Sequence, residues 1–308
     1  MIMKNFFTPL EIITGKTLVL NPLRFLTGLT PLTLSAMFLF LVACDSIKQK
    51  NNDEIEDPIN VENIDYEAAE DQPEPIIMEK DGLKLSSVEL SPEFPDAIIY
   101  MENPGYESKF ETGNIEFSYN IRNYELANQT TDAAGKMCAN SAKGQHIHLI
   151  LNNEPYTAHY EAKFVKQLEP GNYVSLSFLS RSYHESIKHR GAYDLKRFSV
   201  GVTDTFDFDM SAKHLFYSRP KGEYFGDDTK KILLDFYLYD TKLKEDGDKV
   251  RATINGTEFI LTRWVAYFIE GLPLGENTIK LELIDKEGKL IEGPYNSVER
   301  SIMLSELK

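Results

Sequence analysis

The sequence predicts an all-β protein with two tandem immunoglobulin-like β-sandwich domains behind an N-terminal segment of different composition. Three observations predict this organisation. Alternating apolar and polar residues fill the chain from about Lys84, the pattern occurs twice, and the first 83 residues differ in charge and hydropathy from the rest. Strand side chains alternate between the two faces of a sheet, so such runs favour strands, and strong helical periodicity is absent.

The N-terminal 43 residues have the layout of a secretory signal. A lead with three basic residues and one acid precedes an apolar run from Leu32 to Ala43, which is too short for a membrane-spanning helix. The run ends in "LVAC", Leu41 to Cys44, which resembles a bacterial lipobox. The resemblance implies cleavage before Cys44 and lipidation of that cysteine, which would anchor the chain to a membrane through acyl groups. The alternative is an N-terminal membrane helix.

Residues 44–83 read as a disordered acidic tether. Positions 45–83 hold 13 acids against three lysines, so this stretch carries a net charge of −10 out of −15 for the chain. Like charges repel one another and a single aromatic residue offers little to bury, so we expect an extended segment. No basic stripe is present, which argues against nucleic acid as a partner.

Only two cysteines occur, Cys44 and Cys138. If Cys44 is lipidated, Cys138 has no partner within the chain, and no disulfide framework stabilises the fold. Stability must then come from buried apolar surface.

Strand-like runs separated by Gly, Pro, Asn and Asp turns follow the tether in two series. The first series is "IEFSYNIR", "HIHLILNN", "YVSLSFLS" and "FSVGV", and the second is "ILLDFYLYD", "VRATING", "TIKLELID" and "RSIML".

The two series align as an internal repeat. An offset of 117 residues matches Tyr100 with Tyr217 and Phe117 with Leu234, and an offset of 104 matches Tyr160 with Trp264. The size and strand spacing of each copy fit an immunoglobulin-like sandwich, with copy 1 at 84–205 and copy 2 at 206–308. Copy 1 carries an insertion, residues 127–144, which leads directly to His146. Loops vary without disturbing a core, so function is commonly added at such a place.

His146 and His148 alternate with Ile147 and Leu149, so the two imidazoles share one face of the predicted strand. The aliphatic face is the better candidate for the core. Their counterparts in copy 2 are Lys249 and Arg251, which mark a solvent-facing position. The sequence therefore predicts that both histidines are exposed.

Two imidazoles at positions i and i+2 of a strand can bind one Zn²⁺ or Cu²⁺ ion if further ligands are near. Zn or Cu is thus an alternative to a protein without a cofactor, and the sequence does not define the remaining ligands. The candidates in copy 1 are Cys138, His159, His184, Glu185 and His189.

A basic loop, "SRSYHESIKHRG", is the second candidate site. Arginine can clamp a phosphate or carboxylate bidentately, with serine hydroxyls as further donors, so the loop suits an anionic ligand. The alternative is a solvated hairpin that happens to be basic. The predicted ligand-binding residues are Arg181, Ser182, His184, Lys188 and Arg190.

The segments "GQHIHLILNNEPYTAHYEAKF", "LSFLSRSYHES" and "LFYSRPKGEY…LLDFYL" resemble a family of uncharacterised Bacteroidota lipoproteins with duplicated Ig-like domains. Some of its members carry the loose label "phosphopeptide-binding". The resemblance implies an envelope location, on the periplasmic or surface face of the outer membrane, and it assigns no site residues.

Together these features predict a lipid-anchored extracytoplasmic binding protein. Its ligand would be an anionic or phosphorylated peptide or an envelope protein. The alternatives are a Zn- or Cu-binding envelope lipoprotein and a structural component of an envelope complex. The chain contains no G-x-S-x-G, H-E-x-x-H, phosphate-binding glycine loop or Ca²⁺-loop pattern, so we expect no enzymatic activity.

Overall fold

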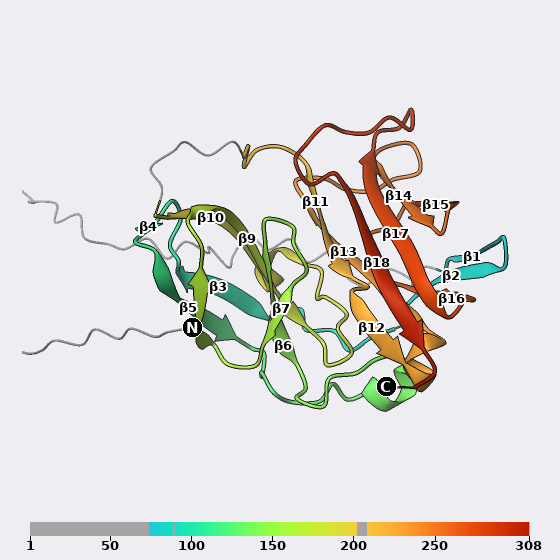
Figure 1. Ribbon diagram of the computed structural model, residues 1–308, viewed down its shortest axis with the longest axis horizontal. Helices are drawn as coiled ribbons and strands as arrows, with labels where there is room; N and C mark the ends of the chain where they lie inside the picture. Colours follow the sequence, from blue (N-terminus) through green and yellow to red (C-terminus); the bar gives the residue numbers. More distant parts are fainter. Residues whose placement is uncertain (1–73, 89, 202–207, 308) are drawn as a thin grey trace, which may run out of the picture. The chain divides into compact units, whose positions relative to one another are not determined.

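The computed structural model describes residues 74–88, 90–201 and 208–307. The predicted signal peptide, most of the tether and Cys44 lie outside these residues. Within them the chain forms strands β1 to β18 and only short helices, so the all-β prediction is confirmed (Figure 1). The helical segments are α1 (Ala133–Lys136), η2 (Arg190–Ala192) and η3 (Gly226–Thr229).

The first sandwich pairs a three-stranded sheet with a five-stranded sheet. Phe117, Ile147, Leu149 and Phe198 are fully or almost fully buried between them. The three-stranded sheet has the order β3 (Ile98–Asn103), β5 (Gly113–Arg122), β8 (Lys163–Leu168). The other has the order β4 (Lys109–Phe110), β10 (Tyr193–Val200), β9 (Gly171–Ser180), β6 (His146–Leu151), β7 (Thr157–His159).

The second sandwich repeats this arrangement, as the internal repeat predicts. In both sandwiches a short strand runs parallel to the last strand, β4 beside β10 and β12 beside β18. One sheet has the order β12 (Gly222–Phe225), β18 (Ser297–Ser305), β17 (Gly275–Ile284), β14 (Lys249–Ile254), β15 (Thr257–Leu261). The facing sheet contains β11 (His214–Arg219), β13 (Ile232–Tyr239) and β16 (Tyr267–Glu270).

An N-terminal hairpin extends that facing sheet, which differs from the predicted boundaries. Strands β1 (Ile77–Lys80) and β2 (Leu83–Ser87) pair with each other, and β2 pairs antiparallel with β16. Residues 77–87 therefore belong to the second sandwich, although the sequence suggests a tether up to residue 83 and copy 1 from residue 84. The reason is that Leu83 and Leu85 alternate into the core of the second sandwich and complete its edge.

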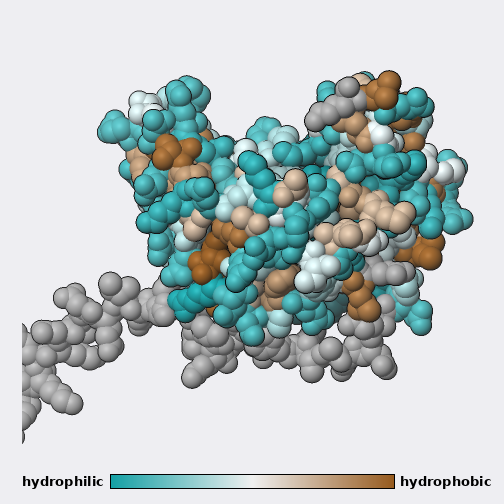
Figure 2. Space-filling model, turned by 90° about the horizontal axis from the view of Figure 1, so that it is seen from below, coloured by the Kyte–Doolittle hydropathy of each residue, from teal (hydrophilic) through white to brown (hydrophobic). Residues whose placement is uncertain are grey.

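The two sandwiches pack face to face. An apolar cluster joins Leu176 and Phe178 of the first sandwich to Phe216 and Tyr237 of the second, and the rings of Phe178 and Tyr237 lie 4.9 Å apart. Strands β6, β9, β11 and β13 are consequently buried on both faces. The second sandwich packs against the face of the five-stranded sheet formed by β6, β9 and β10. Polar residues make up most of the outer surface in the view of Figure 2.

A buried carboxylate holds the loop after β9 to the second sandwich. Asp235 on β13 is fully buried, accepts hydrogen bonds from the backbone and hydroxyl of Ser186, and forms an ion pair with Lys188. Asn153, in the turn after β6, forms a second link, because its side chain bonds to the backbone of Leu215 and Tyr217 on β11.

We predict that Asp235→Ala lowers the free energy of unfolding by about 3–5 kcal/mol, because it leaves the Lys188 ammonium without its counterion in a buried site. Denaturant unfolding measures this loss. The double variant Asp235→Leu/Lys188→Met should recover most of it, since an apolar pair needs no counterion. A loss below about 1 kcal/mol for Asp235→Ala would show that this pair does not hold the sandwiches together.

Candidate metal centre

His146 and His148 lie on β6, and both are fully buried. The prediction that Ile147 and Leu149 face the core of the first sandwich is confirmed. The prediction that the histidines face solvent is wrong, because the second sandwich covers that side of the sheet. Their counterparts Lys249 and Arg251 on β14 have no such cover and are only partly buried.

A third histidine joins them from the loop after β9. His184 ends a tight turn, in which its backbone N–H donates to the Arg181 carbonyl, and its φ of 71° is left-handed. The Nε2 atom of His146 lies 2.8 Å from Nε2 of His148 and 3.1 Å from Nδ1 of His184. These three nitrogen atoms lie within 4.8 Å of one another, and they form the only such group of possible metal ligands in the described ranges.

Hydrogen bonds orient two of the rings. The Nδ1 atom of His146 lies 2.8 Å from the carbonyl of Gly144, which can only accept, so Nδ1 carries the proton and Nε2 has a lone pair. The Nδ1 atom of His148 lies 3.4 Å from the hydroxyl of Ser218 on β11. Ligand histidines in metal sites are commonly fixed in this way by a partner on the second ring nitrogen.

Aromatic side chains enclose the cluster. The ring of Tyr156 stacks on His148 at 3.6 Å, and its hydroxyl lies 3.3 Å from Nδ1 of His184. The Tyr160 ring lies 5.0 Å from the ring of His146, and the Phe178 ring lies 5.1 Å from that of His148. These rings limit the access of water to the buried imidazoles of His146 and His148, whereas His184 is only partly buried.

Two cations adjoin the cluster. Arg219 is 7% exposed and donates to the hydroxyls of Tyr156 and Tyr224, and Lys221 donates to the Tyr156 carbonyl. Among the described residues no ion pair joins Arg219 to a carboxylate. The positive charges of Arg219 and Lys221 would repel a bound cation, so the imidazole lone pairs would have to hold it against this repulsion.

Burial keeps the three imidazoles neutral. It lowers the pKa of His146 to about 4, and the charges of Arg219 and Lys221 act in the same direction. Burial also lowers the pKa values of His148 and His184 well below the usual range of histidine. At neutral pH all three side chains are in the form that binds a metal ion.

The other ligand candidates lie elsewhere. His159 stacks on Phe164, with ring centroids 3.4 Å apart, and the Nε2 atom of His189 lies 2.9 Å from the Phe94 carbonyl. Glu185 accepts a hydrogen bond from Ser91. Cys138 is buried in a separate apolar cluster, and burial raises the pKa of its thiol to about 11. Of the five candidates from the sequence, the structure brings only His184 to the pair on β6.

The basic loop does not form the exposed surface that the sequence suggests. Arg181 is 7% exposed and donates to the carbonyls of Pro92 and Ser186. The Ser182 hydroxyl accepts from the backbone of Thr130. Lys188 pairs with Asp235, and only Arg190 is exposed, over the Tyr193 ring. Lys188 faces inward because Asp235 of the second sandwich pairs with it, and Arg181 does so because the carbonyls of its own loop and of the segment before β3 accept its hydrogen bonds.

No family model and no curated protein matches the chain, so the resemblance to Bacteroidota lipoproteins stays a prediction. Solved structures with some likeness include fibronectin(III)-like modules of Clostridium thermocellum CbhA, with 11% identity, a TM-score of 0.24, and coverage of 68% of this chain and 95% of that one. Another is the Ig1-2 module of the Drosophila receptor protein tyrosine phosphatase DLAR, with 8% identity, a TM-score of 0.20, and coverage of 68% and 99%.

A third is SGBP-B of the Bacteroides ovatus mixed-linkage glucan utilization locus, solved with a heptasaccharide. Its identity is 9%, its TM-score is 0.20, and the coverage is 67% of this chain and 47% of that one. Likeness at this level says nothing about a ligand of this chain.

We predict that the metal-free protein loses stability as the pH falls from about 6.5 towards 4. The pKa of an unfolded histidine is about 6.5, whereas that of folded His146 is about 4, so acid protonates the unfolded chain first. Each such histidine contributes a slope of up to about 1.4 kcal/mol per pH unit in this window.

Urea unfolding in the presence of a chelator at several pH values measures the slope. His146→Gln removes one of the titrating groups and should flatten the curve between pH 6.5 and 4. An identical slope in this variant and the parent protein would contradict the assignment.

Proposed function

We propose that this protein is a metal-binding protein of the bacterial envelope that holds Zn²⁺ or Cu²⁺ through His146, His148 and His184. The observation that supports the proposal is the convergence of three neutral imidazoles from β6 and the loop after β9. The Nε2 atoms of His146 and His148 lie 2.8 Å apart, and only one proton fits between them. At least one of these two atoms therefore directs a lone pair at the other ring. A shared cation would satisfy these lone pairs together.

The spacing suits a tetrahedral ion. A Zn²⁺ ion with Zn–N bonds of about 2.0–2.1 Å separates its ligand atoms by about 3.4 Å. The distances of 2.8 and 3.1 Å from His146 Nε2 would lengthen, and the separation between the His148 and His184 nitrogen atoms, at most 4.8 Å, would adjust towards the same value as the rings turn to the ion. Imidazole donors suit both Zn²⁺ and Cu²⁺. We propose a role in binding and not in catalysis, because the aromatic rings around the cluster restrict access to the ion.

In the described part of the chain, no helix has the length and hydropathy that crossing a bilayer requires. We propose that Cys44 anchors the protein to the membrane, with the acidic segment as a spacer. The support is the "LVAC" sequence behind the apolar run from Leu32. A lipid anchor would keep the metal site at the outer membrane of the cell envelope.

We predict that the mature chain, carrying Cys44→Ala for solubility, binds one Zn²⁺ or Cu²⁺ ion per molecule in a calorimetric titration. His146→Gln and His184→Gln should each weaken the affinity by about 100-fold or more, since each removes one of three ligands. Glutamine retains the polarity and approximate volume of the side chain.

His159→Gln is the matched control, because His159 lies on β7 next to β6 but outside the cluster. It should bind metal like the parent protein. The proposal is wrong if the parent protein binds neither ion. It is also wrong if His146→Gln and His184→Gln bind metal as tightly as the control variant His159→Gln.

For the anchor, we predict that the full chain expressed in a Gram-negative bacterium enters the detergent phase of a Triton X-114 extract. Cys44→Ala removes the thiol that carries the lipid and should move the protein to the aqueous phase. Cys138→Ala is the control and should stay in the detergent phase. Detergent partitioning of the Cys44 variant would instead favour an N-terminal membrane helix.

A further inference from the structure

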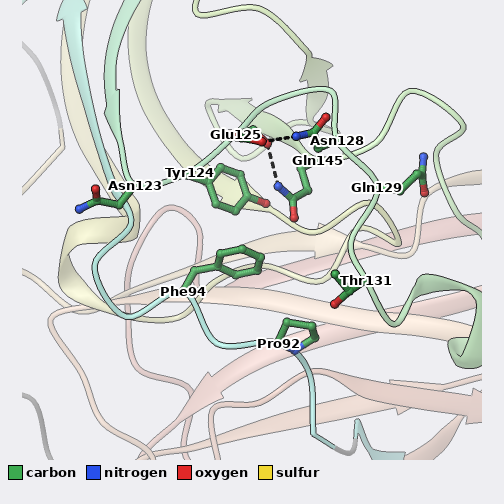
Figure 3. Close-up of a pocket in the computed structure, with 9 residues that line it drawn as sticks. All are labelled: Pro92, Phe94, Asn123, Tyr124, Glu125, Asn128, Gln129, Thr131 and Gln145. Carbon is green, nitrogen blue, oxygen red and sulfur yellow. Dashed lines mark hydrogen bonds between the residues drawn. The ribbon is translucent and has the colours of Figure 1, made fainter.

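A pocket of about 630 Å³ opens at the end of the first sandwich. Its residues come from three segments: Phe94 precedes β3, Asn123 to Thr131 follow β5, and Gln145 precedes β6. In Figure 3 the side chains of Phe94, Tyr124 and Gln145 point towards a common space. The pocket is separate from the histidine cluster, and no step of the metal proposal depends on it.

The insertion of copy 1 builds one wall of this pocket. Its base is closed by two backbone hydrogen bonds, from Ala127 to the Gln145 carbonyl and from Gln145 to the Asn128 carbonyl. Gly144 is required at this closure, because its φ is +87° and a Cβ atom would lie 2.5 Å from the Asn128 carbonyl group. The second sandwich has only a short turn at the equivalent place and lacks this wall.

Internal contacts hold the inner side chains in place. The Tyr124 hydroxyl donates to the Ser180 carbonyl, and the rings of Phe94 and Tyr124 meet edge to face with centroids 4.9 Å apart. Gln145 is buried, donates to the Glu125 carbonyl at 2.7 Å, and accepts from the hydroxyl of Thr130. A pocket whose side chains are already ordered loses little entropy when a ligand binds.

The charge and polarity of the lining residues indicate which class of ligand the pocket suits. None of its lining residues is cationic, and the neighbouring Arg181 is engaged with the Pro92 carbonyl and with Glu185, so the lining does not favour an anion. Pro92, Phe94 and Tyr124 supply the apolar part of the lining and the other side chains are polar, so the pocket suits a ligand that has both polar groups and a less polar face. Asn123, Glu125 and Asn128 are exposed at the rim, and Asn128 donates to the Glu125 carboxylate. Asn123 donates to the Asp96 carbonyl, and carboxylate and amide groups have more hydrogen-bonding atoms than these two contacts use.

We infer that this pocket binds a neutral saccharide. Amide groups both donate and accept hydrogen bonds, and a carboxylate accepts several, which matches the hydroxyl groups of a sugar ring. The edge-to-face pair of Phe94 and Tyr124 provides an apolar floor for the less polar face of such a ring. The inference adds a second ligand class to the metal proposal and stands independently of it.

The test uses the mature chain with Cys44→Ala on an array of neutral oligosaccharides and of peptides, in buffer with EDTA. We expect retention on neutral saccharides. Titration with the best of them should show about tenfold weaker binding by Glu125→Ala/Asn128→Ala, from the loss of two rim side chains. The control is Glu245→Ala/Asp246→Ala, which removes two exposed side chains from the corresponding turn of the second sandwich and should bind like the parent protein.

Binding to no neutral saccharide, binding to peptides alone, or equal affinity of the rim variant and the parent protein would each overturn the inference. The EDTA in the buffer separates it from the metal proposal, because saccharide binding in EDTA needs no metal ion. Binding that appears only when Zn²⁺ or Cu²⁺ replaces EDTA would assign the saccharide to the histidine cluster and overturn the inference.

Discussion

The face-to-face contact between the two sandwiches is the constraint on which the rest of the molecule depends. An isolated sandwich would leave the outer face of the sheet with β6 and β9 in water, whereas here Leu176 and Phe178 pack on Phe216 and Tyr237. Removal of this apolar surface from water stabilises the contact and sets the environment of every polar group that falls within it. His146, His148, Arg219 and Asp235 are all buried because of it.

Burial of polar groups in such a contact is costly unless each group finds a partner. The structure provides partners by pairing residues of one sandwich with those of the other. Asp235 accepts from Ser186 and Lys188, and Asn153 bonds to the backbone of β11. The histidine cluster differs from these links, because its imidazoles are partners of one another and adjoin the cation of Arg219. A cluster of titratable side chains that converge on one another inside a protein is where we expect a ligand.

The duplication also separates scaffold from function. Both copies keep the same strand order, yet the three histidines of the cluster, the insertion and the basic loop after β9 occur in copy 1 alone. At the equivalent strand of copy 2, Lys249 and Arg251 are partly buried and adjoin no third sandwich. Copy 2 contributes by covering copy 1 and by placing Ser218 and Arg219 beside the cluster. The two copies thus differ in loops and in one strand face, where the candidate sites lie, and not in the fold.

The sequence by itself determined the all-β class, the repeat and the inward side of β6, because these follow from local alternation and from the similarity of the two copies. It also singled out His146 and His148 as a possible metal pair. It could not determine their burial, since an exposed strand face and a face covered by another sheet carry the same alternation. For the same reason it suggested a solvated basic loop, where Arg181 and Lys188 in fact face inward. The choice of His184 over four other candidates, and the pairing of β2 with β16, were decided by the tertiary structure, because both join residues that are distant in the chain.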